Sequence, residues 1–267
     1  MGVLLGERVE LPVRTIHWSE PKRHFLVSIR SSSVAGNGRW VDYSRRREWD
    51  LLLNYYDEPP SVIPAADMVT YGGASKFPAA WQTNRDHDGF LAAYRAVFFL
   101  DNDIDLQFED VDRLFAIFSE FELWLAQPSL SQGSHFSWPI TQHQPSRRLR
   151  YTNFVEIMAP VLSDTALAKC LPTFNQSISG WGLDLIWPAL LGNPTNRIAV
   201  IDEIEMTHPD RVDPANGRFY RYLSSIGVDP YAESERLARE YEVPRDYPTE
   251  QYGEVRSDNG DKTESPE

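Results

Sequence analysis

Short, uninterrupted apolar runs recur along the first half of the chain and are separated by polar or glycine-rich stretches. Runs of this length are typical of strands that are buried on both faces of a sheet. They predict strands over residues 24–30, 49–56, 67–71, 96–100 and 123–126. Between the last two, apolar residues recur at the spacing of one helix face, at Val111, Leu114, Phe115 and Phe118. Because strands and helices alternate, the pattern predicts an α/β fold with a mixed, mostly parallel central sheet.

The rest of the pattern predicts further helices and sets the expected domain limits. Helices are predicted from Lys76 onwards, over 165–171 and over 183–191, and the last clear strand covers 197–201. Residues 24–246 are expected to form one domain after an N-terminal extension, 1–23. Residues 247–267 carry six acidic side chains against two basic ones and show no apolar period. This tail is therefore expected to be disordered.

Composition supports a folded domain and argues against two classes of partner. With 267 residues, 42% of them hydrophobic, the chain can bury a sizeable core. A net charge of −13 argues against broad binding to a nucleic-acid backbone. No apolar stretch reaches the ~20 residues of a transmembrane segment. The start of the chain lacks the features of a signal peptide, and the single Cys170 fits a reducing compartment, so a cytoplasmic location is expected.

The most informative segment joins the predicted strand over 96–100 to an acidic cluster. Asp101, Asp103 and Asp105 are spaced two apart, so on an extended chain they share one face. They follow the C-terminal end of a strand, where open α/β sheets bind their ligands. Hard oxygen ligands suit Mg²⁺ or Mn²⁺, which complete their shell with water and phosphate oxygens. The alternative interpretation is an ordinary Asx turn before the next helix.

Two later segments, together with Asp101-Asn102-Asp103, resemble parts of a known class of enzymes. They are the turn Gly180-Trp181-Gly182-Leu183-Asp184 and the histidine of Met206-Thr207-His208-Pro209. Their order resembles glycosyltransferases of the GT-A fold. More narrowly, the chain resembles the family catalogued as domain of unknown function 707, found in plants and bacteria. The blocks that carry this likeness are residues 99–104, 127–129, 154–160 and 180–184.

The resemblance implies a single GT-A-like, Rossmann-like domain and a metal-dependent glycosyltransferase. The donor would be a nucleotide-diphospho-sugar, a UDP-sugar foremost. Asp101, Asp103 and His208 would hold Mn²⁺ or Mg²⁺, and Asp101 and Asn102 would also contact the donor. A divalent cation would stabilise the charge that develops on the diphosphate leaving group.

The same resemblance implies further donor contacts at the ends of the early strands. Arg30 and Ser31 would lie near the nucleotide base and ribose. Lys76 could reach a phosphate or a uracil carbonyl, although a solvated surface lysine is the alternative interpretation. Trp181 offers an apolar face to a sugar ring.

For the acceptor, a glycan or another small hydroxyl compound, the resemblance implies a catalytic carboxylate. Asp184 follows the Gly-Trp-Gly turn at an expected helix N-terminus, which would keep it ionised. Such a base makes the enzyme inverting. Many GT-A enzymes carry two acids at this point, whereas Leu185 follows Asp184 here. Glu156, which interrupts an apolar stretch, is therefore the second candidate.

Two other functions are compatible with parts of the pattern. A non-catalytic carbohydrate- or nucleotide-binding protein could retain a degenerate transferase fold. A phosphohydrolase of the haloacid dehalogenase type also places Asp-x-Asp after a strand, but its motif lies near the start of the chain and has a different residue at the position of Asp105. Nucleotide binding and phosphatase turnover separate these alternatives.

Overall fold

The computed structural model describes residues 11–32, 40–41, 46–209, 211, 213, 215, 217–244 and 246–257. Its strands are β1 (Val13–Trp18), β2 (Phe25–Ser31), β3 (Trp49–Tyr55), β4 (Met68–Gly72), β5 (Ala96–Asp101), β6 (Leu125–Leu130), β7 (Arg147–Thr152), β8 (Val161–Ser163), β9 (Ile198–Met206) and β10 (Gln251–Arg256). Its α-helices are α1 (Lys76–Asp86), α2 (Phe108–Glu120), α3 (Asp164–Cys170), α4 (Leu183–Leu190), α5 (Arg218–Ser225) and α6 (Pro230–Glu240). Short 3₁₀ helices span Phe90–Ala93, Pro139–Thr141 and Leu171–Thr173. No helix among these residues is long and apolar enough to cross a membrane.

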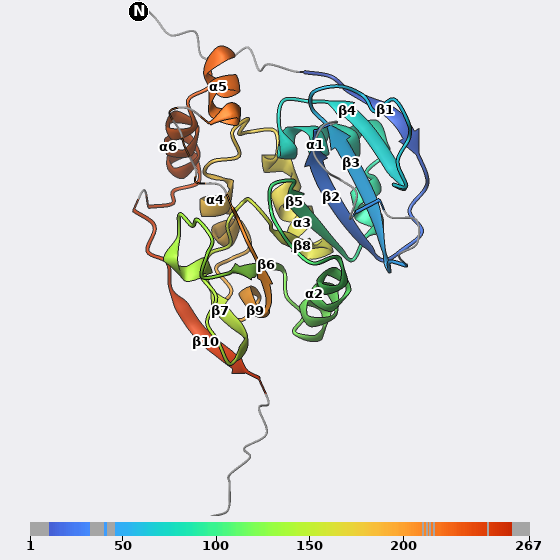
Figure 1. Ribbon diagram of the computed structural model, residues 1–267. Helices are drawn as coiled ribbons and strands as arrows, with labels where there is room; N and C mark the ends of the chain where they lie inside the picture. Colours follow the sequence, from blue (N-terminus) through green and yellow to red (C-terminus); the bar gives the residue numbers. More distant parts are fainter. Residues whose placement is uncertain are drawn as a thin grey trace, which may run out of the picture.

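The strands form one mixed sheet in the order β1-β4-β3-β2-β5-β8-β6-β9-β7-β10 (Figure 1). The pairs β4–β3, β3–β2, β2–β5 and β6–β9 are parallel. The other neighbours are antiparallel, including both partners of the short β8. The prediction of a mostly parallel sheet is therefore wrong. Apolar runs indicate burial on both faces but carry no information on strand direction.

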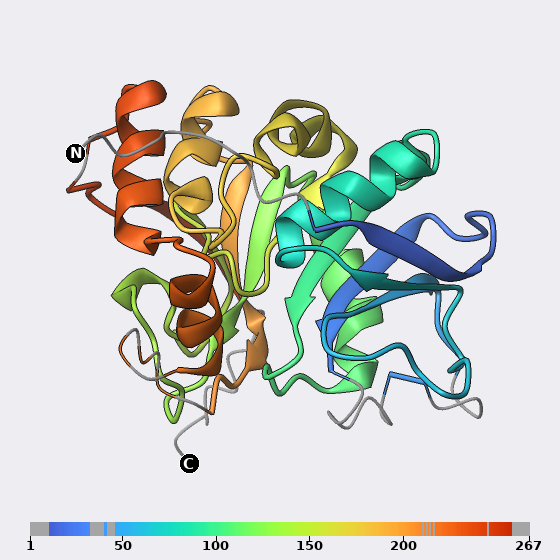
Figure 2. The same cartoon turned by 90° about the horizontal axis from the view of Figure 1, so that it is seen from above.

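Apolar side chains on the two faces of the sheet form two separate cores. Alternate residues of β5 illustrate this: Phe98 and Leu100 pack toward α2, whereas Val97 and Phe99 pack toward the opposite layer. On that opposite face α1, α3, α4 and α6 lie in a row (Figure 2). With both faces covered, the carboxyl ends of the strands are the place where polar side chains can gather.

The strands and helices predicted in the first half are confirmed, with small shifts of their ends. Ser163 caps α3 by accepting a hydrogen bond from the backbone N of Ala166, at 3.1 Å. The pattern missed β1, β7, β8, β10, α5 and α6. The predicted extension is wrong for residues 13–18, because β1 pairs with β4.

The predicted disordered tail is likewise wrong for residues 251–256, because β10 pairs with β7 at the sheet edge. This strand is half exposed and has few apolar residues, so hydrophobic patterning could not reveal it. Residues 1–10 and 258–267 lie outside the described residues.

Candidate active site

A cavity of about 920 Å³ lies at the carboxyl ends of β2 and β5, and its walls are completed by the first turns of α1 and α4 and by α5. The volume is of the size that holds a cofactor or a nucleotide. Almost every predicted site residue lines this one cavity: Arg30, Lys76, Asp101, Asn102, Asp103, Glu156, Trp181, Asp184 and His208. Ser31 does not line it and is fully buried.

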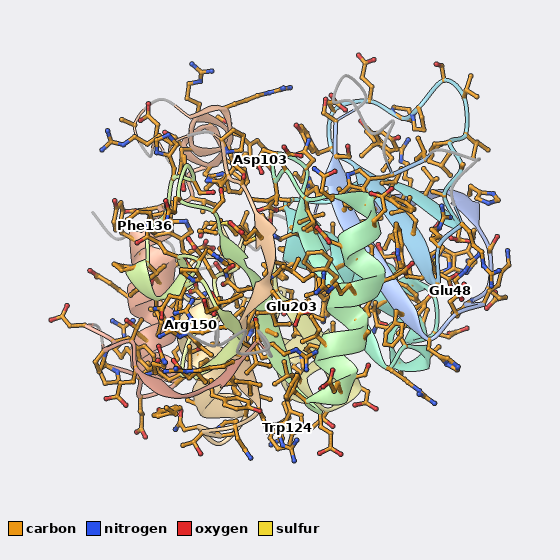
Figure 3. The ribbon with its side chains drawn as sticks, turned by 60° about the horizontal axis from the view of Figure 1, so that its bottom comes forward. Glu48, Asp103, Trp124, Phe136, Arg150 and Glu203 are labelled. Atoms are coloured by element: carbon orange, nitrogen blue, oxygen red, sulfur yellow. The ribbon has the colours of Figure 1, made fainter. Side chains whose placement is uncertain are left out.

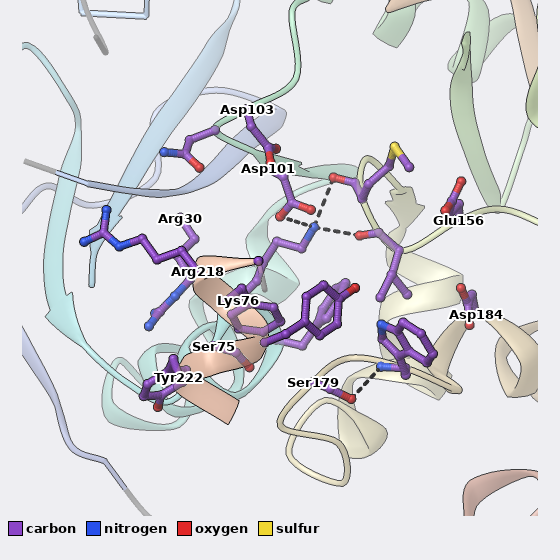
Figure 4. Close-up of a pocket in the computed structure, with 18 of the residues that line it drawn as sticks. Arg30, Ser75, Lys76, Asp101, Asp103, Glu156, Ser179, Asp184, Arg218 and Tyr222 are labelled. Carbon is purple, nitrogen blue, oxygen red and sulfur yellow. Dashed lines mark hydrogen bonds and ion pairs between the residues drawn. The ribbon is translucent and has the colours of Figure 1, made fainter. Parts of the chain in front are cut away.

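Lys76, the first residue of α1, lies deep in the cavity rather than on the surface (Figure 4). Its Nζ lies 2.7 Å from Asp101 Oδ1 and donates hydrogen bonds to the carbonyls of Ile157 and Met158, at 2.6 and 3.0 Å. One ammonium thus joins α1, the end of β5 and the loop before β8. A solvated surface lysine was one interpretation of the sequence, and the low exposure of this side chain, 10%, excludes it.

A long-range backbone pairing brings His208 to the acidic turn. The backbone N and O of Asp105 pair with those of Thr207, each at 2.8 Å, which places His208 beside Asp103. His208 Nε2 lies 3.7 Å from Asp103 Oδ2, and the neighbouring Asp103 carboxylate raises the pKa of His208. Because residues 102 and 103 form a turn rather than extended chain, Asp105 leaves the shared face and does not line the cavity.

The predicted metal ligands fit a divalent cation only in part. Asp103 and His208 supply one hard oxygen and one imidazole nitrogen, and the 3.7 Å gap allows both to bind one cation at ~2.1 Å. Asp101, by contrast, already binds Lys76 through Oδ1. Among the described residues, no group of three or more His, Cys, Asp or Glu side chains is arranged to hold a metal.

Two buried carboxyl groups face the other side of the cavity (Figure 4). Burial raises the pKa of Glu156 to about 8, and the nearby Asp184 carboxylate adds to this shift. Glu156 Oε2 has no hydrogen-bond partner within the described part of the chain. Burial also raises the pKa of Asp184 to about 7, although backbone N–H groups, including that of Leu185 at 3.0 Å, oppose the rise. Position in the first turn of α4 is therefore not enough to keep Asp184 strongly ionised.

The glycines of the turn before α4 are required by its geometry. Gly180 and Gly182 have φ angles of +83° and +88°, and a Cβ on Gly182 would lie 2.9 Å from the backbone of Ser234. The turn packs this closely against α6, which the sequence analysis did not predict. Trp181 projects into the cavity wall, where its ring meets that of Tyr231 at 4.9 Å.

Glu233 of α6 fixes the segment that enters this turn. Its carboxylate accepts hydrogen bonds from the backbone N of Ile178 and of Ser179, both at 2.8 Å. Ser179 Oγ in turn accepts from the backbone N of Trp181, at 3.1 Å (Figure 4). Nothing local in the sequence marks Glu233, because it lies 55 and 54 residues beyond Ile178 and Ser179, whose backbone it binds.

Arg30 is held by hydrogen bonds within the protein, which indicates a structural role rather than binding of a nucleotide base. It donates hydrogen bonds to the carbonyls of Gly72 and Gly73, at 3.0 and 2.8 Å, and burial lowers its pKa to about 10. The open side of this wall is formed by Tyr56, over whose ring both Arg30 and Arg218 lie at 5.6 and 5.7 Å. Aromatic and guanidinium groups at the mouth suit a planar or anionic ligand.

The fold and the cavity define an α/β protein with a large mixed sheet and an acid-lined cavity at the strand ends. A family model described as "Protein of unknown function (DUF707)" matches residues 74–218, more than half of the chain. The protein belongs to this family. No curated protein sequence matches the chain.

Among solved structures, TarS of S. aureus matches at 12% identity with a TM-score of 0.37, over 81% of this chain but only 42% of TarS. S. aureus TarS 1–349 matches at 9% identity with a TM-score of 0.39, over 80% of this chain and 69% of that chain. Its complex with UDP-GlcNAc matches at 10% identity with a TM-score of 0.37, over 80% of this chain and 70% of that chain. Similarities this distant establish no function for the present protein.

Proposed function

We propose that this protein is a metal-dependent glycosyltransferase that uses a nucleotide-diphospho-sugar donor. The observation that carries the proposal is the division of one cavity into two chemically different walls. Asp103 and His208 lie on one wall, at a strand end suited to a cation and a diphosphate. Glu156 and Asp184 lie on the other, where burial raises the pKa values of both carboxyl groups.

On the donor side, this chain would supply two metal ligands and an aromatic side chain at the opening of the cavity. Asp103 and His208 would hold Mn²⁺ or Mg²⁺, which when bound neutralises the charge of a diphosphate leaving group. Asn102 lies at the tip of the same turn and lines the cavity beside it. Tyr56 with Arg218 would contact the nucleotide at the open end.

On the acceptor side, Asp184 would act as the general base and Trp181 would pack against the acceptor ring. The acceptor hydroxyl gives its proton to Asp184, its oxygen forms a bond to the anomeric carbon, and the bond from that carbon to the diphosphate oxygen breaks with its electron pair. A pKa near 7 suits this role, because the carboxylate is available at neutral pH and still basic enough to accept the proton. Attack from the face opposite the leaving group inverts the anomeric configuration.

Calorimetric titration with UDP and with GDP, each with Mn²⁺, tests the donor half of the proposal. We expect one of the two to bind with Mn²⁺, and Asp103→Asn to weaken this binding at least tenfold. Asp105→Asn is the matched control, since this carboxylate lies two residues further on and outside the cavity, and it should change the affinity by less than twofold. Absence of binding by either nucleotide to the folded protein would refute a nucleotide-dependent transferase, and phosphatase turnover would favour a hydrolase.

A further inference from the structure

Four aromatic side chains form a row along one wall of the cavity, and we call this group the aromatic row. Its members, in the order in which they contact one another, are Tyr231 on α6, Trp181 in the turn before α4, and Tyr220 and Phe219 on α5. The ring centre of Trp181 lies 4.9 Å from that of Tyr231 and 6.1 Å from that of Tyr220. The rings of Tyr220 and Phe219 are 5.9 Å apart, and all three contacts are edge to face.

The two ends of the aromatic row are exposed and lead to different parts of the molecule. Phe219 adjoins Arg218, which lies over the ring of Tyr56 at the end of the cavity proposed for the nucleotide. Tyr231, at the other end, is 56% exposed and lies on α6. Ser234, three residues further on the same face of this helix, lines the cavity. At Tyr231 the row therefore continues the cavity outward over α6, away from the nucleotide end.

The ring of Tyr231 is exposed but fixed in position. Asp229 accepts a hydrogen bond from the backbone N of Tyr231 at 2.9 Å, and the ring packs against Trp181. A fixed aromatic ring loses little conformational entropy when a ligand covers it, and the covered apolar surface stabilises the complex. Single exposed aromatic residues are ordinary on protein surfaces. The class of ligand must therefore be argued from the cavity to which this ring is joined.

The part of the cavity beside the aromatic row is polar. Glu156 and Asp184 line it and are only 6% and 7% exposed. The backbone N of Ile157 hydrogen-bonds to the Asp184 carboxyl group, so the two acids lie on adjoining parts of the wall. Glu156 Oε2 has no hydrogen-bond partner in the described chain, and a buried polar atom in this state costs free energy. A ligand hydroxyl is a suitable partner, because it both donates and accepts.

A sugar chain combines the two properties that this wall requires. A pyranose ring has an apolar C–H face, which packs on an aromatic ring, and hydroxyl groups around its edge. A purely apolar ligand would cover Tyr231 but leave Glu156 without a partner. A single small alcohol is too short to reach both.

We infer that the acceptor is a saccharide of at least two rings, whose terminal ring binds at Glu156 and Asp184 and whose second ring packs on Tyr231 outside the cavity. The inference rests on the proposed function for the role of this saccharide as acceptor. Tyr231 determines which acceptor binds, without touching the reacting atoms.

Binding of saccharides in the absence of a donor tests the inference. Saturation-transfer NMR with glucose, galactose, mannose, N-acetylglucosamine and their disaccharides identifies a pair that binds, and NMR titration gives the two affinities. The disaccharide should bind at least tenfold more tightly than its monosaccharide. Tyr231→Ala should weaken disaccharide binding about tenfold and monosaccharide binding less than twofold, whereas Tyr231→Phe keeps the ring and should retain the wild-type affinities. Tyr252→Ala is the matched control, since this tyrosine is 41% exposed on β10, at the opposite end of the molecule from α6 (Figure 1).

Several results would overturn the inference. These are equal affinities for the two saccharides, an unchanged gain from the second ring in folded Tyr231→Ala, or loss of that gain in Phe219→Ala alone. A larger gain from the octyl chain of octyl glucoside than from a second sugar ring would show an apolar occupant and also overturn it. Nucleotide binding without binding of any saccharide would refute this inference alone. If neither UDP nor GDP binds, the proposed function is refuted, whereas a gain with saccharide length that depends on Tyr231 would still establish the sugar site.

Discussion

Two pairs of buried residues in the second half of the chain, one an arginine with an aspartate and the other two acids, differ in how their charges are balanced. Arg150 and Asp202, whose side chains are fully buried, form a two-bond ion pair at 2.7 and 3.1 Å. Arg150 also donates to the carbonyls of Ile140 and Gln142, and it lies away from Asp103 in Figure 3. Glu156 and Asp184 are also buried and line the cavity, but neither forms an ion pair with another described side chain, and the Asp184 carboxylate adds to the raised pKa of Glu156.

The difference shows which buried charges hold the fold and which are poised for chemistry. A carboxylate that meets a guanidinium is neutralised and contributes to a rigid core. A carboxyl group that is buried beside a cavity and forms no ion pair keeps a raised pKa, and its proton can be exchanged with a ligand. Perturbed groups of the second kind gather in functional sites more often than elsewhere.

The largest effect is expected from removing the base. Asp184→Asn keeps the shape of the side chain but cannot accept a proton, so transfer should fall by about 10²–10⁴ while nucleotide binding is retained. In wild type the rate should rise as pH increases through about 7, where Asp184 loses its proton, and then level off. Steady-state transfer rates of wild type and Asp184→Asn, measured across the pH range, test the loss of rate and the pH dependence. The control is Asp164→Asn, at the exposed first turn of α3, and a loss of rate as large in that variant would remove the special role of Asp184.

The Arg150–Asp202 ion pair should affect the stability of the protein rather than the rate of transfer. Arg150→Met leaves Asp202 buried without its counter-ion and should lower the free energy of unfolding by about 3–5 kcal/mol. Urea unfolding measures this change. Asp184→Asn, which removes a carboxyl group that has no counter-ion among the described side chains, should not destabilise the protein at pH 8. Equal destabilisation by the two substitutions would erase the distinction between the pairs.

The stability of the protein should depend on pH through Glu156. The folded protein keeps this proton up to about pH 8, whereas the unfolded chain releases it near 4.3, so folding takes up a proton in between. Wild-type stability therefore falls as pH rises through this window. Relative to wild type, Glu156→Gln should gain roughly 1 kcal/mol per pH unit between pH 5 and 8. A constant difference between the two proteins would show that Glu156 is ionised in the folded state.

The smallest effect is local and concerns the segment held by α6. Glu233→Gln can accept only one of the two backbone hydrogen bonds from Ile178 and Ser179. Hydrogen exchange of these amides should accelerate about tenfold, with donor binding unaffected. Glu240→Gln on the same helix is the matched control. Unchanged exchange at residues 178–181 would mean that the turn holds its shape without Glu233.

How much of this site the sequence could predict depends on the range of the interaction. The acids after β5 and the glycine turn before α4 are local signals, and both lie where the pattern placed them. The pairing of Asp105 with Thr207 and the Lys76–Asp101 ion pair join segments far apart in the chain. No local periodicity encodes such contacts.

Strand direction and the edge strands were beyond the sequence for related reasons. The three-residue β8 reverses direction between β5 and β6, and its apolar residues look the same in either direction. The exposed edge strand β10 has almost no apolar period. The family, by contrast, was predicted from four local blocks of sequence, three of which contribute residues to the wall of the cavity.

Proton NMR of a panel of UDP- and GDP-sugars, incubated with the protein, Mn²⁺ and simple glycan acceptors, tests the central claim most directly. We expect one nucleotide sugar to be consumed and a new anomeric signal of opposite configuration to appear, with Asp184→Asn binding the same donor but forming product at least a hundredfold more slowly. Product with retained configuration would contradict the role of Asp184 as base. A folded protein that binds none of these donors would contradict the assignment of the cavity to nucleotide-sugar transfer.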